Sequence, residues 1–260
     1  MDLGLTGKIA LITGGSKGIG LATAIRLMLE GANVAICARS ADGLQAADEI
    51  IRERTGRSAT LIQADVATRD GCERAVAETV QAYGGLDILV NNAGTSAARP
   101  FEQIEPEDWA GDLDLKLFAA INCSRAAIPH MKQAGGGAIV NVTASRAKTP
   151  GASSMPSSVS RAAGMALTKA MSKDLGAYGI RVNTVCIGTI RSAQIERMWQ
   201  AQAPDMTWKQ FARDPRHGIP LGRIGEAEET ANVIAFLVSE AASYVTGTSV
   251  NIDGGQAAAL

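Results

Sequence analysis

The chain is poor in the side chains that most often carry acid–base and metal chemistry. Its 260 residues include two histidines, three tyrosines and four cysteines, and aromatic residues make up only 4%. The cysteines lie far apart and show no metal-ligand spacing (Cys37, Cys72, Cys123 and Cys186). We therefore expect no bound metal, and we expect free thiols in a reducing, cytoplasmic compartment.

An excess of one charge and a long apolar run are also missing. The formal net charge is −1, which argues against a nucleic-acid-binding surface. No apolar run is long enough to span a bilayer, and the first residues lack the basic and apolar regions of a signal peptide. The sequence thus predicts a globular protein with neither a nucleic-acid nor a membrane partner.

Apolar runs typical of strands alternate with helical patterns along the chain. The predicted strands are residues 8–13, 33–38, 59–64, 86–90, 138–142, 181–185 and 249–252. The predicted helices are residues 21–30, 42–54, 69–83, 106–132, 155–178 and 227–239. Such alternation predicts an α/β fold with a doubly wound parallel sheet covered by helices on both faces. Without repeats or linkers, residues 1–260 are predicted to form one domain.

One long stretch, at about residues 187–225, lacks a clear strand or helix pattern. It carries several large apolar side chains among polar ones (Met198, Trp199, Met206, Trp208 and Phe211). Long loops in compact domains often cover binding sites, which predicts a substrate lid. A small satellite core around a short helical insert is the alternative.

The segment at residues 13–20, Thr-Gly-Gly-Ser-Lys-Gly-Ile-Gly, stands between the first predicted strand and the first predicted helix. Glycines allow a sharp turn and a close approach to phosphates, while the free N–H groups at the helix start face the anion. This layout predicts that the segment binds the pyrophosphate of a dinucleotide.

With these features the sequence resembles the short-chain dehydrogenase/reductase (SDR) family over nearly its whole length. The motifs that carry the resemblance are residues 13–20, Asn91-Asn92-Ala93-Gly94, Ile139-Val140-Asn141, residues 179–183, Tyr244-Val245-Thr246-Gly247 and Asp253-Gly254-Gly255. The resemblance implies a Rossmann-type fold with about seven strands, an NAD(P)-binding oxidoreductase domain, and assembly as a homotetramer or homodimer.

The family pattern also implies where the cofactor binds. An acidic residue after the second strand suits a ribose 2′-OH, but residues 38–40 are Ala-Arg-Ser. Arg39 and Lys17 suit a 2′-phosphate, which favours NADP(H) over NAD(H). The residues implied to bind the cofactor are Gly14, Ser16, Lys17, Gly18, Ile19, Gly20, Arg39, Ser40, Asp65, Val66, Asn91, Ala93, Gly94, Arg161, Gly188, Ile190 and Ser192.

The family's catalytic residues are a tyrosine, a lysine four residues later, an upstream serine and an asparagine. Aligning the surrounding pattern places Ser157 at the tyrosine position and Arg161 at the lysine position. Ala144, next to Ser145, falls at the serine position, and Lys116 falls at the asparagine position. All four positions are therefore substituted. A serine hydroxyl is a far weaker acid than a phenol, so Ser157 cannot simply take over the tyrosine's role.

Three functional hypotheses remain. In the first, the protein is an NADP(H)-dependent oxidoreductase acting on a carbonyl or alcohol, with Lys116 for the proton and Ser157, Ser145 or Thr143 for orientation. An ordinary surface ion pair between Lys116 and Asp112 is the alternative explanation for this lysine. In the second, it is a catalytically silent subunit that binds NADP(H) and pairs with an active paralogue. The third, which resembles the halohydrin dehalogenases, fits Arg161 but not the intact glycine loop.

Three further cations are expected near the pocket mouth: Arg146, Lys148 and Arg191. They favour an anionic substrate, and solvated surface cations are the alternative. His130 and His217 have no nucleophile or carboxylate placed beside them in the sequence, so neither is expected to act in catalysis.

Overall fold

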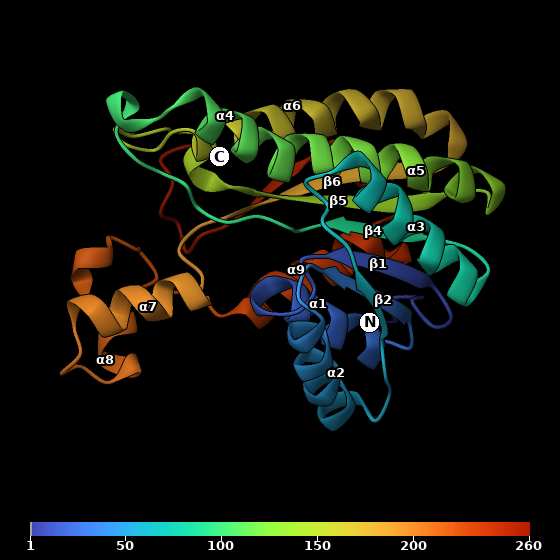
Figure 1. Cartoon of the computed structure of the whole chain (residues 1–260), viewed down its shortest axis with the longest axis horizontal. Helices are drawn as coiled ribbons and strands as arrows, with labels where there is room; N and C mark the ends of the chain where they lie inside the picture. The colour runs from blue at the N-terminus through green and yellow to red at the C-terminus, as the bar shows by residue number, and fades with distance from the viewer. Residues whose placement is uncertain (1) are drawn as a thin grey trace.

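The computed structural model describes residues 2–260, and its described part contains a single sheet of seven parallel strands (Figure 1). The strands are β1 (Ile9–Thr13), β2 (Asn33–Ala38), β3 (Thr60–Gln63), β4 (Ile88–Asn91), β5 (Gly137–Ala144), β6 (Ile180–Ile187) and β7 (Ser249–Ile252). Their order across the sheet is β3-β2-β1-β4-β5-β6-β7. The predicted doubly wound, Rossmann-type α/β fold is confirmed.

Helices cover both faces of this sheet. They are α1 (Gly18–Leu29), α2 (Ala41–Thr55), α3 (Arg69–Tyr83), α4 (Pro106–Leu113), α5 (Ala119–Gln133), α6 (Ser157–Leu175), α7 (Ala193–Gln202), α8 (Trp208–Ala212) and α9 (Ala227–Val238). In Figure 1, α1, α2 and α9 lie on one side of the sheet and α3, α5 and α6 on the other. None of the helices described here has the length and apolarity needed to cross a membrane.

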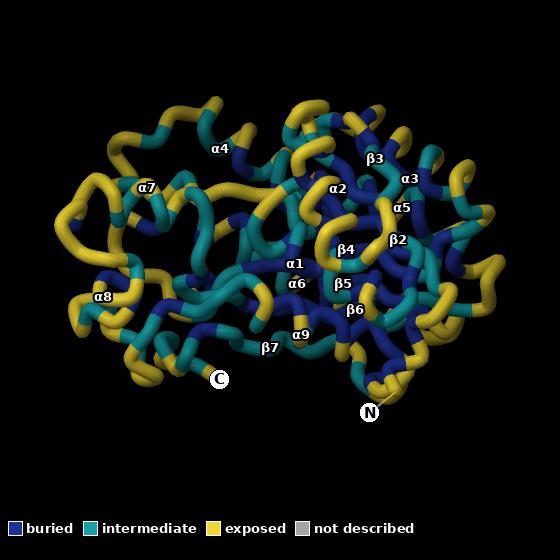
Figure 2. The backbone as a smooth tube through the Cα atoms, turned by 90° about the horizontal axis from the view of Figure 1, so that it is seen from below, coloured by how far each residue is buried: buried dark blue, intermediate teal, exposed yellow. Residues whose placement is uncertain are grey.

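The core lies in two layers, one on each face of the sheet, and Figure 2 shows the central strands as its most buried part. Successive residues of β1 belong to opposite core layers. Leu11 packs with α3 and α5, and Ile12 packs with α1, α2 and α9. Both side chains are fully buried. A strand covered on both faces must be apolar at every position, which explains the continuous apolar runs in the sequence.

The long helix predicted at residues 106–132 is interrupted. A π-helical stretch, Asp114–Phe118, separates α4 from α5. Wide π turns often occur at functional sites. This one contains Lys116, whose side chain lies in the protein interior.

The segment at residues 187–225, which the sequence predicted to be irregular, holds α7 and α8. Ser192 caps α7 by accepting from the Ile195 N–H at 3.3 Å, and Thr207 and Gln210 form a capping box at the start of α8. Around these helices lies a separate apolar cluster whose buried members are Ala203, Phe211, Ala212 and Ile224. The aromatic residues therefore do form a satellite core. Figure 1 shows α7 and α8 projecting to the left of the main body.

Candidate active site

A cleft of about 1010 Å³ lies at the carboxyl ends of the central strands, beside the point where the strand order reverses between β1 and β4. Ligands of open α/β sheets bind at such switch points, because the connections on either side leave in opposite directions. The glycine turn, the segments after β2 and β4, the start of α6 and the helix α7 all contribute to its walls.

The glycine turn after β1 is held in a shape that only glycine permits at two points. Gly14 has a φ of +65°, and a Cβ there would lie 2.9 Å from the Ala93 backbone. A Cβ on Gly20 would overlap the Gly14 carbonyl oxygen. The Asn92 side-chain amide donates to the carbonyls of Thr13 and Gly14, at 3.0 and 3.1 Å. The turn is thus shaped to let a phosphate approach its backbone.

Most residues that the family pattern assigned to the cofactor line this one cleft. They are Gly14, Ser16, Lys17, Gly18, Ile19, Arg39, Ser40, Asp65, Val66, Ala93, Gly94, Arg161, Gly188, Ile190 and Ser192. Gly20 and Asn91 lie behind the cleft wall: both are buried, and the Asn91 amide donates to Asn141 at 2.9 Å. Their position indicates that they support the sheet and the turn around the cleft.

The end of the cleft beside β2 is cationic. Lys17 and Arg39 are both exposed there, and among residues 2–260 neither side chain has an ion-pair partner. Ser40 starts α2 by accepting from the Gly43 N–H at 3.1 Å. The residues present therefore fit a nucleotide that carries an additional phosphate.

Three of the positions that the sequence aligned with the family's catalytic residues lie close together: Lys116 contacts Ser157, and Lys116 and Arg161 line the same small hollow. The Lys116 ammonium, from the π turn, donates to the Ser157 hydroxyl at 2.8 Å. It also forms an ion pair with Asp112, whose other carboxylate oxygen accepts from Ser160 at 2.6 Å. The side chains of Lys116 and Asp112 are 1% and 2% exposed. The alternative explanation, a surface ion pair, is therefore wrong, because α4 turns this face into the interior.

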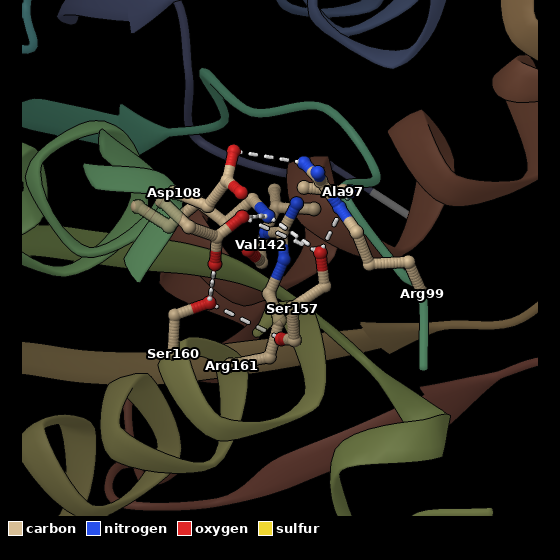
Figure 3. A network of polar contacts seen from close by, with 9 residues as sticks. Ala97, Arg99, Asp108, Val142, Ser157, Ser160 and Arg161 are labelled. Carbon is tan, nitrogen blue, oxygen red and sulfur yellow. Dashed lines mark hydrogen bonds and ion pairs between the residues drawn. The ribbon is translucent and has the colours of Figure 1, made fainter. Parts of the chain in front are cut away.

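Ser157, the first residue of α6, is partly exposed and lines the cleft. Its oxygen accepts from Lys116 and from the Ala97 N–H, which lies 2.9 Å away (Figure 3). Arg99 holds this loop in place, because its N–H donates to the Met155 carbonyl at 2.9 Å. A hydroxyl accepts two hydrogen bonds and donates one, so the Ser157 proton remains for Asp112, at 3.4 Å, or for a ligand in the cleft.

Burial lowers the pKa of two cations in this cluster, Lys116 and Arg161. It lowers the pKa of Lys116, and the nearby Arg161 lowers that pKa further, while Asp112 opposes both effects. Burial also lowers the pKa of Arg161, whose guanidinium donates to the Val142 carbonyl. A Cβ on Gly94 would lie 2.7 Å from the same guanidinium, so a larger residue there would displace the end of the Arg161 side chain.

The other two candidate hydroxyls, Ser145 and Thr143, do not line the cleft, although Thr143 borders the same small hollow as Lys116. Ser145 is 1% exposed and Thr143 is 3% exposed, and the Thr143 hydroxyl contacts Thr184 and Cys186 of β6 at 3.1 Å. Ala144 does line the cleft, but it has no polar side-chain atom. These positions give no sign of an orienting hydroxyl in the cleft.

The three tyrosines are far from the cleft lining, as the sequence indicated. The Tyr83 hydroxyl bonds to Thr60 and to the Val34 carbonyl, at 2.9 and 3.0 Å. Tyr178 packs under the Lys132 ammonium, and Tyr244 is fully exposed. His217 lines the cleft, but its Nε2 contacts the Phe211 carbonyl at 2.7 Å.

Sequence reasoning missed Asp112 and Ser160 as members of the cluster. A signal for Asp112 existed, because the buried positions of the following helix (Ala119, Ala120, Cys123, Ala127 and Met131) extend back at helical spacing to residues 116 and 112. An i,i+4 pair on a buried face is not a surface pair.

Comparison with known proteins identifies the family of this chain. A family model described as enoyl-(acyl carrier protein) reductase matches residues 14–257. The chain belongs to the short-chain dehydrogenase/reductase family. It is 35% identical over 256 residues to a 3-oxoacyl-[acyl-carrier-protein] reductase from Synechocystis, covering 96% of this chain and 97% of that one.

Two solved SDR structures are similar over the whole fold. L-sorbose reductase from Gluconobacter frateurii, complexed with NADPH and L-sorbose, is 34% identical, with a TM-score of 0.93 over 100% of both chains. A short-chain oxidoreductase from Pseudomonas aeruginosa PAO1, NADPH-bound and described as containing an atypical catalytic center, is 34% identical, with a TM-score of 0.91 over 97% of this chain and 98% of that one. The SDR resemblance and the oxidoreductase class are thereby confirmed.

Proposed function

We propose that this SDR is an NADP(H)-dependent oxidoreductase that interconverts a carbonyl compound and its alcohol, using a Lys116–Ser157 pair where relatives use a tyrosine. The observation that carries the proposal is the 2.8 Å contact between the Lys116 ammonium and the Ser157 hydroxyl, at the wall of the cofactor-shaped cleft.

The nucleotide would be held by this chain's own groups along one side of the cleft. The glycine turn would receive the pyrophosphate, and Lys17 and Arg39 would bind the 2′-phosphate. Arg161, already fixed by the Val142 carbonyl, would reach the nicotinamide ribose. When bound, the nucleotide supplies or accepts the hydride. Two similar structures contain NADPH, which supports the same choice here.

The proton path follows from which groups reach the cleft. Ser157 lines it, whereas Lys116 lines a separate hollow of about 10 Å³ behind it. In the reducing direction, the Ser157 hydroxyl would give its proton to the carbonyl oxygen of the substrate while the Lys116 ammonium returns one to Ser157. The oxygen becomes a hydroxyl and Lys116 becomes a neutral amine. A lysine whose pKa is lowered by burial is suited to this exchange.

The silent-subunit hypothesis is the second candidate. The substitution of all four family positions motivates it, but the matched relatives are named as reductases and dehydrogenases, which supports activity instead. The dehalogenase-like hypothesis is the weakest, because the glycine turn is intact. We retain a homodimer or homotetramer, the usual SDR assembly, as part of the proposal, with pairing to an active paralogue as the alternative.

The test is NADPH oxidation measured over a panel of aldehydes, ketones, oxo acids and sugars. General acid catalysis is worth about 10²–10⁴-fold, so K116M and S157A should each lower kcat by about 100-fold or more. S157T, which keeps a hydroxyl, should retain most of the rate, and K173M, on the exposed end of α6, should retain all of it.

Full rates in both K116M and S157A would contradict the relay. No turnover on any compound, together with tight NADPH binding, would favour the silent subunit. In that case the triple variant S157Y/R161K/A144S would show whether the cleft still accepts a carbonyl.

A further inference from the structure

Most of the charged side chains that line the cleft are positive. Six lysine or arginine residues line it against two aspartates (Lys17, Arg39, Arg146, Arg161, Arg197 and Arg216 against Asp65 and Asp214). The whole chain carries a net charge of −1. A cleft lined by one sign of charge concentrates ligands of the opposite sign.

Four of these cations already have an assigned role or a partner. Lys17 and Arg39 lie at the end of the cleft beside β2, and Arg161 donates to the Val142 carbonyl. Arg216 is paired with Asp214, and this contact lowers the pKa of Asp214 to about 2. Arg146 and Arg197 remain.

Arg146 and Arg197 come from different walls of the cleft. Arg146 follows β5 in the 3-10 turn Ser145–Ala147, close in sequence to Ala144, and Arg197 belongs to α7. Both are exposed, and neither side chain has a hydrogen bond or an ion pair with any residue in the range 2–260.

The other two cations expected at the pocket mouth are occupied. Lys148 donates to the Ser249 carbonyl at 3.2 Å. Arg191 pairs with Glu196 at 2.9 Å and stacks over the Trp208 ring. Neither is among the residues that line the cleft, so the prediction from sequence is corrected to Arg146 and Arg197.

The remaining lining mixes polar and apolar side chains. It includes Thr95, Ser96, Ser154, Ser158, Gln194, Gln202 and Gln256, while Ile195, Met198 and Phe211 also belong to the apolar cluster of the α7–α8 segment. Such a wall offers a substrate both hydrogen-bonding groups and apolar surface.

We propose that Arg146 and Arg197 form an anion subsite, and that the substrate is a carbonyl compound carrying a carboxylate or phosphate group. The planar guanidinium fork matches both oxyanions. The inference uses the proposed function for the reacting carbonyl, but the anion subsite itself does not depend on turnover.

The experiment compares charged and neutral substrates of matched size: 2-oxobutanoate with its methyl ester, and dihydroxyacetone phosphate with dihydroxyacetone. We expect kcat/KM to favour one charged member by about tenfold or more, which is the usual effect of a charge-assisted hydrogen bond. R146Q and R197Q should each reduce that preference, and the double variant should remove it. If the preference appears with 2-oxobutanoate, the subsite binds a carboxylate. If it appears with dihydroxyacetone phosphate, the subsite binds a phosphate.

R213Q is the matched control, because Arg213 is an exposed arginine of the same segment that does not line the cleft. It should leave the charged-to-neutral ratio unchanged. A ratio near one, or a ratio unaffected by the double variant, would overturn the anion subsite and leave the proposed function standing.

A second measurement is independent of catalysis. Calorimetric titration of the NADP⁺-loaded protein with malonate and with inorganic phosphate should show binding of at least one, lost in the R146Q/R197Q variant and kept in R213Q. Binding of this kind without any carbonyl turnover would support the subsite and contradict the proposed function. No binding of either anion, together with no charge preference, would contradict the subsite.

Discussion

Asp112 occupies a buried position where a carboxylate is costly unless its charge is balanced. It is balanced here by Lys116 and by the Ser160 hydroxyl. Because Ser157 bonds to the same lysine, Asp112 positions the ammonium and also holds it in the charged form. We therefore regard Asp112 as a positioning residue of the proposed proton relay.

Replacing Asp112 by asparagine should shift the pH dependence of carbonyl reduction. Reduction needs charged Lys116, so the rate falls as pH rises through the pKa of that group. Burial and Arg161 lower this pKa and Asp112 opposes them, so D112N should move the falling limb to lower pH. The measurement is kcat/KM for reduction against pH. If kcat/KM of D112N falls over the same pH range as in the wild type, while the variant still binds NADPH, Asp112 does not control the pKa of Lys116.

The proposed preference for NADP(H) rests on two side chains at the other end of the cleft, Lys17 and Arg39. Substituting Arg39 by alanine should weaken NADPH binding by about 10- to 100-fold, because a charge-assisted hydrogen bond is worth about 1.5–3 kcal/mol. NADH binding should change little. Calorimetric titration of both nucleotides measures this, with R54A on the exposed end of α2 as a control. Equal losses for both nucleotides would contradict a 2′-phosphate contact.

The α7–α8 segment acts as a separate element because its apolar cluster does not join either main core layer. Phe211 is central to it: it is 3% exposed and its ring centre lies 6.0 Å from Trp208 and 4.8 Å from His217. The segment lines the cleft as well, so its packing and ligand binding are expected to be linked.

Phe211→Ala should loosen this segment without unfolding the domain. Loss of a buried phenylalanine costs about 3–5 kcal/mol in a well-packed core, and here the cost falls on the local cluster. We expect a higher KM, faster proteolysis within residues 187–225 and a small change in Tm. F101A, at a 66% exposed position, is the control. A large fall in Tm with unchanged proteolysis would show that the segment is part of the main core.

For the whole molecule, a ligand held by the walls of one cleft should stabilise the fold. Binding at 100 times Kd adds about 2.7 kcal/mol to the free energy of unfolding, since the unfolded chain has no such site. For a chain of this length that raises Tm by about 5–10 °C. We expect this shift with NADPH in thermal unfolding, and a smaller one with NADH at the same concentration. An equal shift with both would contradict the preference.

Much of the fold could be predicted from sequence because its signals are local. The helix at residues 69–83 was predicted with its observed bounds, since Thr68 caps its start and Gly84, with a φ of +84°, ends it. The interrupted helix was not predicted, because a π turn preserves the helical apolar pattern on both sides. The capped helices α7 and α8 were missed because short helices depend on tertiary packing.

The sequence by itself determined the α/β class and the glycine turn, since both depend on residue type and short-range order. Only the tertiary structure decided that Lys116 meets Ser157, 41 positions away, and that Asp112 is buried beneath them. It also decided which arginines face the cleft without a partner. Contacts between distant segments fix these facts, because the direction in which a helix face points is set by what packs against it.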